Sequence, residues 1–241
     1  MLITTLTLLI ATGAVPDSPK PEPEPTKPTT AKEALQPFNV LVGSWKGSGV
    51  PEGTKEERAA GAWTEIASWT WHFKGDDAWL GVTFEKSKHF TTGELRYTPE
   101  KGKDELRYTL KLTTPSKTTA TFTGTLKDKV FTLERTDGAG SEDQKLVFSL
   151  LHHNRHLVRL ESRPAGSAVA FTKQWQVGAT KEGVPFAEVA KGPECIVSGG
   201  VGTMKVLYKG KEYWVCCTGC RDAFKDEPEK YIAEAAKPKK P

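Results

Sequence analysis

Cysteine is scarce in this sequence and unevenly placed. Only four of the 241 residues are Cys, and all four lie within about the last fifty residues. Long hydrophobic runs are also missing, since no apolar stretch reaches the roughly 18 residues that a membrane-spanning helix needs. The longest, residues 2–15, is interrupted by Thr and Gly. We therefore expect a mature chain without an integral membrane segment, whose thiol chemistry is confined to the C-terminal end.

An excess of one charge is absent too. The 34 Lys and Arg residues are interleaved with 30 Asp and Glu residues, which leaves a net charge of +4. So small and evenly spread a charge does not predict nucleic acid binding. The sequence also lacks a nucleophile elbow, a phosphate-binding loop and a His-Glu metalloprotease helix, and the Gly-rich residues 199–202 are not followed by Lys and Ser or Thr. We do not expect an enzyme.

The first 35 residues predict export and a tether rather than a folded unit. Residues 1–14 combine an uncharged apolar run with small residues that suit a cleavage site, as in a signal peptide, although no Lys or Arg precedes the run. Residues 15–35 follow as a linker that holds six of the chain's 16 Pro, interleaved with Lys and Glu. Such a segment favours extended polyproline conformation. We expect a periplasmic or secreted protein.

Residues 36–180 show the period-two alternation of half-buried antiparallel strands. The clearest run places Trp63, Trp69, Trp71 and Phe73 on one face, and similar runs start near Val40, Trp79, Glu94, Leu106, Thr119, Val130, Lys145, His156 and Val169. About ten short-connected strands describe an up-and-down meander that should close into a barrel, because closure removes exposed edges. The alternation leaves open whether aromatic side chains fill this barrel or line a pocket for one small apolar ligand.

The start of this region, residues 41–45 (LVGSW), resembles the Gly-x-Trp pattern that opens lipocalin-like barrels, including nitrobindin-type relatives. That resemblance implies haem held by a His late in the barrel. The last predicted strand, residues 169–178, contains no His, so we do not expect haem. His153 and His156 flank a predicted Asn154-Arg155 turn, where two strands could share a metal ion. No carboxylate accompanies them nearby, and we interpret them as solvated loop residues.

The four Cys residues follow a spacing that suits a soft metal. Cys216 and Cys220 are four positions apart and can share one face of a helical turn, while Cys195 precedes a predicted β-hairpin, residues 204–215, that turns at Lys209-Gly210. A short helix over residues 218–224 would start beside the cluster, and its N-terminus would favour thiolates. Asp226 and Glu229 suggest a capping box for a second helix.

The same residues resemble the YHS domain of the TRASH-like treble-clef group. The resemblance covers the Cys spacing, the Tyr-Lys-Gly hairpin at residues 208–210 and the closing PEKY of residues 228–231, within a module of residues 190–236. It implies heavy-metal binding through Cys195, Cys216 and Cys220. Cys217 stands where that pattern commonly has another residue, and strand alternation would point it away from Cys216.

The fold class expected overall is mainly β, with a lipocalin-like antiparallel barrel followed by a small α+β module. Three thiolates suit trigonal Cu(I), whereas structural Zn(II) takes four ligands. An exported protein also meets an oxidising compartment, where four Cys could instead form disulfides. The expected function is soft-metal binding, trafficking or sensing. The alternative is a carrier that binds a small apolar ligand in its barrel, with zinc or disulfides holding the Cys module.

Overall fold

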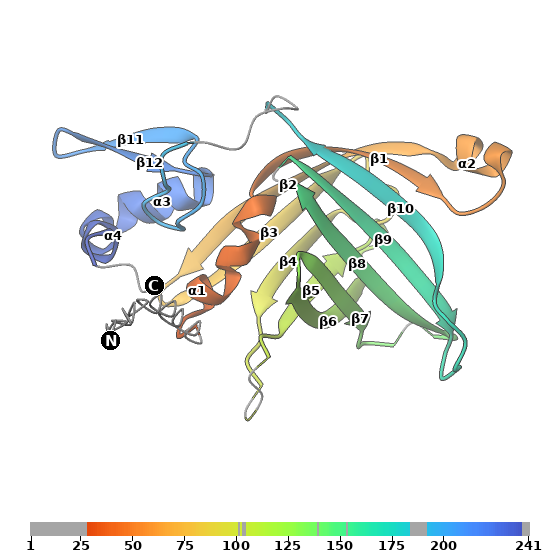
Figure 1. The fold of residues 1–241 in the computed structure, drawn as a ribbon. Coiled ribbons are helices and arrows are strands. Elements are labelled where there is room, and N and C mark those ends of the chain that lie inside the picture. The colour runs from red at the N-terminus through yellow and green to blue at the C-terminus, as the bar shows by residue number, and fades with distance from the viewer. Residues whose placement is uncertain are drawn as a thin grey trace, which may run out of the picture.

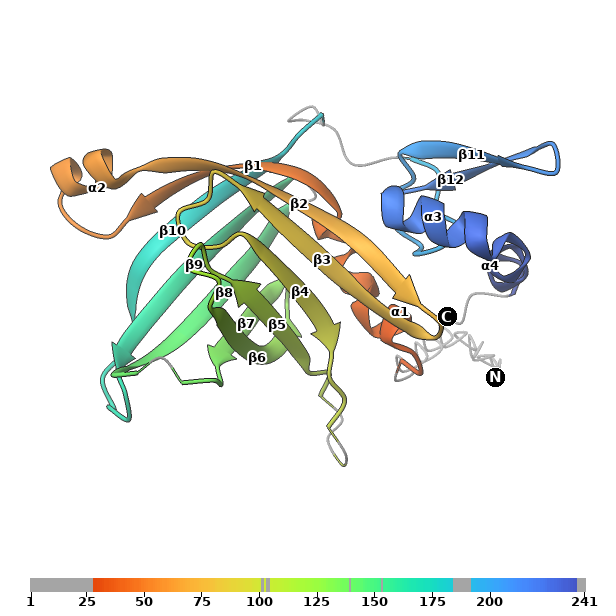
Figure 2. The ribbon, with the colours of Figure 1, turned by 180° about the vertical axis from the view of Figure 1, so that it is seen from behind.

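The computed structural model describes residues 28–100, 102, 105–138, 140–152, 154–183 and 192–237. The predicted signal peptide and the linker as far as residue 27 lie outside these residues. Within the described part of the chain, no helix is both long and apolar enough to cross a membrane. A β-barrel and a smaller C-terminal module lie side by side in both views of the chain (Figures 1 and 2).

Ten strands form a closed antiparallel barrel among the described residues, in the order β1-β10-β9-β8-β7-β6-β5-β4-β3-β2. The last strand closes onto the first, with Trp45 opposite Lys181 and Pro51 opposite Trp175. The strands are β1 (Gly43–Pro51), β2 (Trp63–Lys74), β3 (Asp77–Glu85), β4 (Thr92–Tyr97), β5 (Tyr108–Thr113), β6 (Thr119–Lys127), β7 (Val130–Arg135), β8 (Glu142–His152), β9 (Arg155–Pro164) and β10 (Thr172–Lys181). The predicted up-and-down barrel is confirmed.

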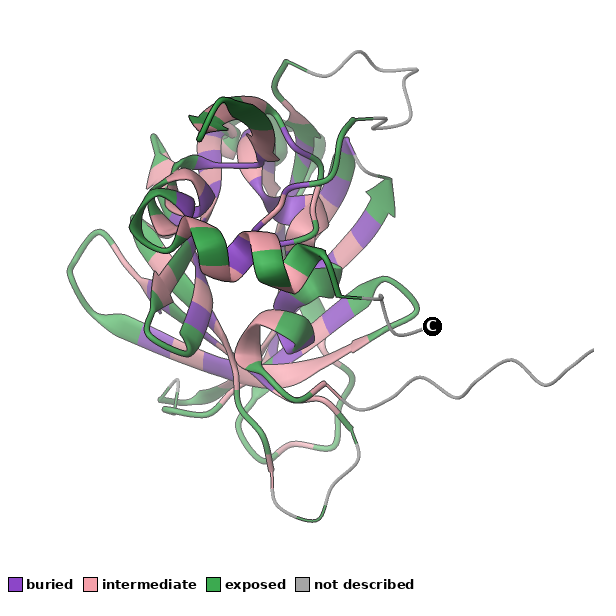
Figure 3. Cartoon of the chain, turned by 90° about the vertical axis from the view of Figure 1, so that its left-hand side faces the viewer, coloured by how far each residue is buried: buried purple, intermediate pink, exposed green. Residues whose placement is uncertain are grey.

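The barrel forms because its strands alternate between apolar and polar side chains. Along β2 every second residue from Glu65 to Trp71 is buried. The same alternation buries Tyr108, Leu110 and Leu112 along β5. Figure 3 shows buried and exposed residues alternating along the strands. Successive side chains of a strand point to opposite faces, so this pattern sends one set of residues into the barrel.

One end of the barrel is closed by residues that the sequence analysis assigned to the linker and to the first strand. Helix α1 (Ala31–Leu35) and the 3-10 helix η1 (Gln36–Leu41) bury Leu35 and Phe38 completely. The ring of Phe38 meets Tyr108 edge to face at 4.9 Å between ring centroids. The prediction of a strand start near Val40 was therefore wrong. Pro37 favours the turn that η1 makes, and the strand begins only at Gly43.

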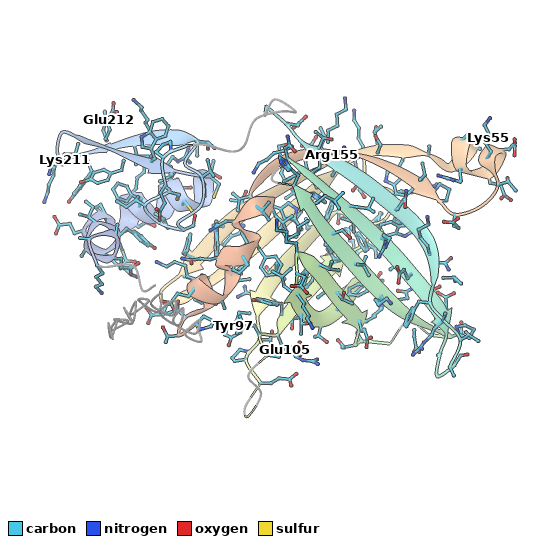
Figure 4. All side chains as sticks on the ribbon, viewed as in Figure 1. Lys55, Tyr97, Glu105, Arg155, Lys211 and Glu212 are labelled. Atoms are coloured by element: carbon cyan, nitrogen blue, oxygen red, sulfur yellow. The ribbon has the colours of Figure 1, made fainter. Side chains whose placement is uncertain are left out.

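Helix α2 (Lys55–Gly61) was also missed by the sequence analysis. It lies in the connection between β1 and β2, where a capping box of Thr54 and Glu57 starts it. No residue of α2 is buried, so no apolar periodicity reveals the helix. It projects from the barrel far from the C-terminal module, with Lys55 at its start (Figure 4).

The C-terminal module consists of a β-hairpin and two helices. The hairpin pairs β11 (Met204–Tyr208) with β12 (Lys211–Val215), and Lys209 and Gly210 both adopt positive φ, as a two-residue type I′ turn requires. Helices α3 (Thr218–Asp226) and α4 (Pro228–Ala235) follow. The predicted capping box at Asp226 is absent: α4 takes Glu227 as its N-cap, without a side-chain hydrogen bond, and starts at Pro228.

The module packs directly against the barrel through α3 and β2. A Cβ added to Gly219 would lie 1.6 Å from the carbonyl oxygen of Trp71, so only Gly allows this approach. Asn39 bridges the two parts, because its Nδ2 donates to the Ser198 carbonyl at 3.0 Å while its Oδ1 accepts from Trp71 Nε1 at 2.9 Å. Polar groups that are buried between the two parts are thus satisfied across the contact.

Candidate metal centre

The Cys cluster lies where the chain passes from strand β12 into helix α3. Cys216 directly follows the strand, Cys217 is the N-cap of α3 with extended backbone angles, and Cys220 lies in the first turn of the helix. Cys195 comes from the loop before the hairpin. That loop is fixed to β12 by a hydrogen bond from the Ile196 N–H to the Trp214 carbonyl, at 2.9 Å. Backbone geometry therefore positions all four thiols.

Three of the thiols converge. The Sγ atoms of Cys195, Cys216 and Cys220 all lie within 4.8 Å of one another, and those of Cys216 and Cys220 are 3.5 Å apart. Sulfur atoms that bind one ion at about 2.3 Å in tetrahedral geometry lie about 3.8 Å apart. The four cysteines are free thiols and are buried. The trio that the YHS resemblance implies is thus brought together at distances that fit ligation of a single ion.

Cys217 lies beside this trio without joining it. Its Sγ is 3.9 Å from the Sγ of Cys216, closer than strand alternation predicts, because the chain leaves the strand at this point. It is not part of the group whose ligand atoms all lie within 4.8 Å. The pKa of Cys217 is lowered by the thiols of Cys216 and Cys220 and, to a smaller extent, by the backbone of Trp71 in the barrel strand β2.

Ser198 supports the sulfur atoms from the loop that carries Cys195. Its backbone N–H donates to the Sγ of Cys195 at 3.5 Å, and its hydroxyl lies 3.3 Å from the Sγ of Cys216. Ser198 is fully buried. Donors of this kind orient ligands and tune their basicity. The sequence analysis overlooked Ser198, although it lies only three positions after Cys195.

The electrostatics of the cluster favour a mixture of thiols and thiolates. Hydrogen bonds from the thiols of Cys216 and Cys220 lower the pKa of Cys195 and of Cys217. The pKa of Cys216 is raised by its hydrogen bond to Cys195, and the pKa of Cys220 by burial. Lys181 of the barrel supplies a nearby positive charge. Burial lowers the pKa of Lys181, and a thiolate at Cys216 would oppose that change.

Residues 202–235 match the YHS domain family. This part of the chain is a YHS module. The match covers the hairpin, Cys216, Cys220 and both helices, while Cys195 lies just before it. Together with the Cys cluster, it identifies the YHS module as a candidate metal-binding unit. The resemblance predicted from sequence is confirmed.

The other comparisons add little to this assignment. No match was found among curated proteins. The chain is similar to a solved structure described as "Crystal Structure of Rv2717c from M. tuberculosis", with 17% identity and a TM-score of 0.37, over 62% of this chain and 97% of that one. At this TM-score the likeness carries no argument about function.

The barrel interior holds a second group of polar side chains. His156, predicted as a solvated loop residue, is only 5% exposed and lies inside the barrel, with its ring 4.4 Å from that of Trp45. That prediction was wrong. The signal was the alternation of His156, Val158 and Leu160 along β9, which places His156 on the inward face. His153 lies outside the described residues.

The burial of His156 predicts that acid destabilises the protein. Burial, and then repulsion from Lys181, lowers the pKa of His156 from 6.5 to about 4. Between these two values the unfolded chain binds a proton that the folded chain does not. The contribution of His156 to stability is therefore complete above pH 6.5 and is lost as the pH falls to about 4. The loss amounts to about 3 kcal/mol.

Urea unfolding at pH 7.5 and pH 4.5 measures this effect. We expect His156→Leu to remove most of the His156 contribution to the pH dependence. His72→Gln is the control, because His72 lies on the outside of β2. Equal slopes of stability against pH in the wild type and in His156→Leu would contradict the assignment of a neutral buried ring to His156.

Proposed function

We propose that this protein is an exported soft-metal-binding protein that holds Cu(I) or Zn(II) through Cys195, Cys216 and Cys220 and acts in metal trafficking or sensing. The observation that carries the proposal is the convergence of three buried sulfur atoms within 4.8 Å of one another in the YHS module. Thiolates are soft ligands, which favour copper and zinc over magnesium or calcium.

The ligand set supports Cu(I) more directly than Zn(II). Three thiolates satisfy a trigonal Cu(I) ion, whereas a structural zinc site takes four ligands. Cys217 is the nearest further thiol. Its Sγ is 3.9 Å from that of Cys216, but it lies outside the group whose ligand atoms are all within 4.8 Å, so it would have to approach at least one of the other sulfur atoms to complete a zinc site. The Ser198 hydroxyl near Cys216 and the charge of Lys181 would help the module hold the excess negative charge of three thiolates.

Export rests on the apolar N-terminal run and the Pro-rich tether that follows it, which would present the barrel and the module outside the cytoplasm. Metal exchange then separates a trafficking or sensing role from a structural one. A metal that passes to a competing chelator within minutes supports trafficking or sensing. A metal that is retained until the module unfolds supports a structural role.

Titration of the reduced protein with Cu(I), and separately with Zn(II), against a chromophoric chelator tests the proposed ligands. We expect Cys195→Ser, Cys216→Ser and Cys220→Ser each to weaken binding of the preferred metal by a hundredfold or more. Cys217→Ser is the matched control and should change the affinity less than tenfold, because Ser is a favourable N-cap. Equal losses in all four variants would show a four-thiol site, and no loss in any of them would contradict the proposal.

A further inference from the structure

The inside of the barrel contains a cavity that metal binding by the YHS module does not use. The volume open to the centre of a water-sized molecule is about 40 Å³, and the cavity opens to solvent at its mouth. Its walls are mainly aromatic and aliphatic, with Trp45, Trp69, Trp175, Phe84, Phe90 and Phe148 among the lining side chains. A mostly apolar pocket with a few polar groups is typical of a small-molecule site.

Two imidazole nitrogens in this cavity have no hydrogen-bond partner although they are buried. They are Nδ1 of His156, whose side chain is more than nine-tenths buried, and Nε2 of His89. The His89 ring stacks on Trp175 at 4.6 Å between ring centroids, and this contact fixes its orientation. Buried polar atoms in native proteins are usually satisfied, so unpaired nitrogens in a cavity point to a missing partner.

Glu65 adds a third polar group. It is 8% exposed, and it accepts hydrogen bonds from Trp63 Nε1 at 2.9 Å and from the Ser87 hydroxyl at 2.7 Å. Both bonds end on Oε2, and the Glu65 carboxylate also lines the cavity. An ionised carboxylate can only accept hydrogen bonds and has room for more than two, so a ligand that pairs with Glu65 must be a donor.

These groups do not form a metal site. Within the described part of the chain, the ligand atoms of His89, His156 and Glu65 do not belong to any group that lies within reach of one ion, as the Cys cluster does. They line the same cavity without meeting at one point, as suits recognition of separate atoms of one molecule. The charge of Glu65 also disfavours an anionic ligand, because two negative charges in an apolar cavity repel each other strongly.

We propose that the barrel binds a small, flat, uncharged aromatic molecule that carries a hydroxyl or ring N–H group, such as a phenol or an indole. The aromatic walls would pack against its faces. The hydroxyl or N–H group would donate to the Glu65 carboxylate or to an imidazole nitrogen of His89 or His156. This function is independent of the Cys cluster.

Calorimetry and saturation-transfer NMR on the full chain test the proposal, with indole and 4-methylphenol as probes. Two control compounds are tested beside them. Toluene has a similar ring but no hydrogen-bond donor, and benzoate carries a negative charge. We expect indole or 4-methylphenol to bind at least tenfold more tightly than toluene, and benzoate not to bind. Glu65→Gln and His156→Leu should each weaken binding of the donor probe at least fivefold, whereas His72→Gln on the outside of the same strand as Glu65 should not.

Thermal unfolding of each variant without ligand checks that the barrel is intact, and a Cys216→Ser, Cys220→Ser double variant should bind the probes as the wild type does. Absence of binding of every probe at millimolar concentration would overturn the proposal. So would equal affinities for toluene and 4-methylphenol. A haem absorption band that appears on addition of haemin and is lost in His156→Leu would also overturn it, since the cavity would then serve a different class of ligand.

Discussion

Replacing Gly219 with Ala is expected to detach the YHS module from the barrel. The added Cβ would lie 1.6 Å from the carbonyl oxygen of Trp71 and 2.8 Å from its carbonyl carbon. Both are backbone atoms of a barrel strand and cannot turn aside as a side chain could. Within an isolated helix, Ala is more favourable than Gly by about 1 kcal/mol. The substitution should therefore destabilise the packing of the module on the barrel without destabilising helix α3 itself.

The expected loss of docking free energy is about 3 kcal/mol or more, beyond the usual range for overpacking because no side chain can adjust. Small-angle X-ray scattering should show a larger radius of gyration, and thermal unfolding should split into two transitions. Gly178→Ala is the control, because a Cβ at that position has open space around it. A Gly219→Ala protein with wild-type scattering and a single unfolding transition would show that the contact is not as close as described.

Replacing Cys220 with Ser is expected to abolish the stabilisation of the YHS module by metal. Cys220 is fully buried at the start of α3, 3.5 Å from Cys216 between Sγ atoms, so its loss removes a ligand that no solvent-exposed group can replace. At a free metal concentration one hundred times the Kd, binding to the folded state alone stabilises the wild type by about 2.7 kcal/mol. The variant should gain close to none of this.

Unfolding of the module in urea, with and without Cu(I) or Zn(II) under reducing conditions, measures this difference. Trp214, on β12 of the module, is a fluorescence reporter when difference spectra are taken against Trp214→Phe. Cys217→Ser should keep most of the gain. If Cys220→Ser is stabilised by metal as much as the wild type, the ion is bound elsewhere.

The sequence was sufficient to predict the parts of this protein that follow a regular pattern. Alternation along the strands predicted the closed barrel of ten strands, and Lys209-Gly210 predicted the hairpin turn. The YHS resemblance implied that Cys195, Cys216 and Cys220 form one group, and the structure brings them together because a hairpin and a helical turn have fixed geometry.

The features that sequence did not reveal depend on tertiary contacts. Helix α1 has five residues next to a Pro-rich segment, too few for a periodic signal, and it is stable because Leu35 packs inside the barrel. The alternation along β9 places His156 inside the barrel. The sequence analysis assigned it to a loop because it lies next to the predicted Asn154-Arg155 turn. The close approach of Gly219 to Trp71 depends on how the YHS module packs against the barrel. A local sequence pattern contains no information about that packing.

The most direct test of the proposed metal function is a measurement of metal content with a parallel count of free thiols. The chain from about residue 15 onward, purified without chelators, is compared with a Cys216→Ser, Cys220→Ser double variant. Our account predicts about one copper or zinc ion per wild-type chain, lost in the variant, and four thiols after the metal is removed. A wild-type protein with no metal and no free thiols would contradict it, because the cysteines would then be disulfides.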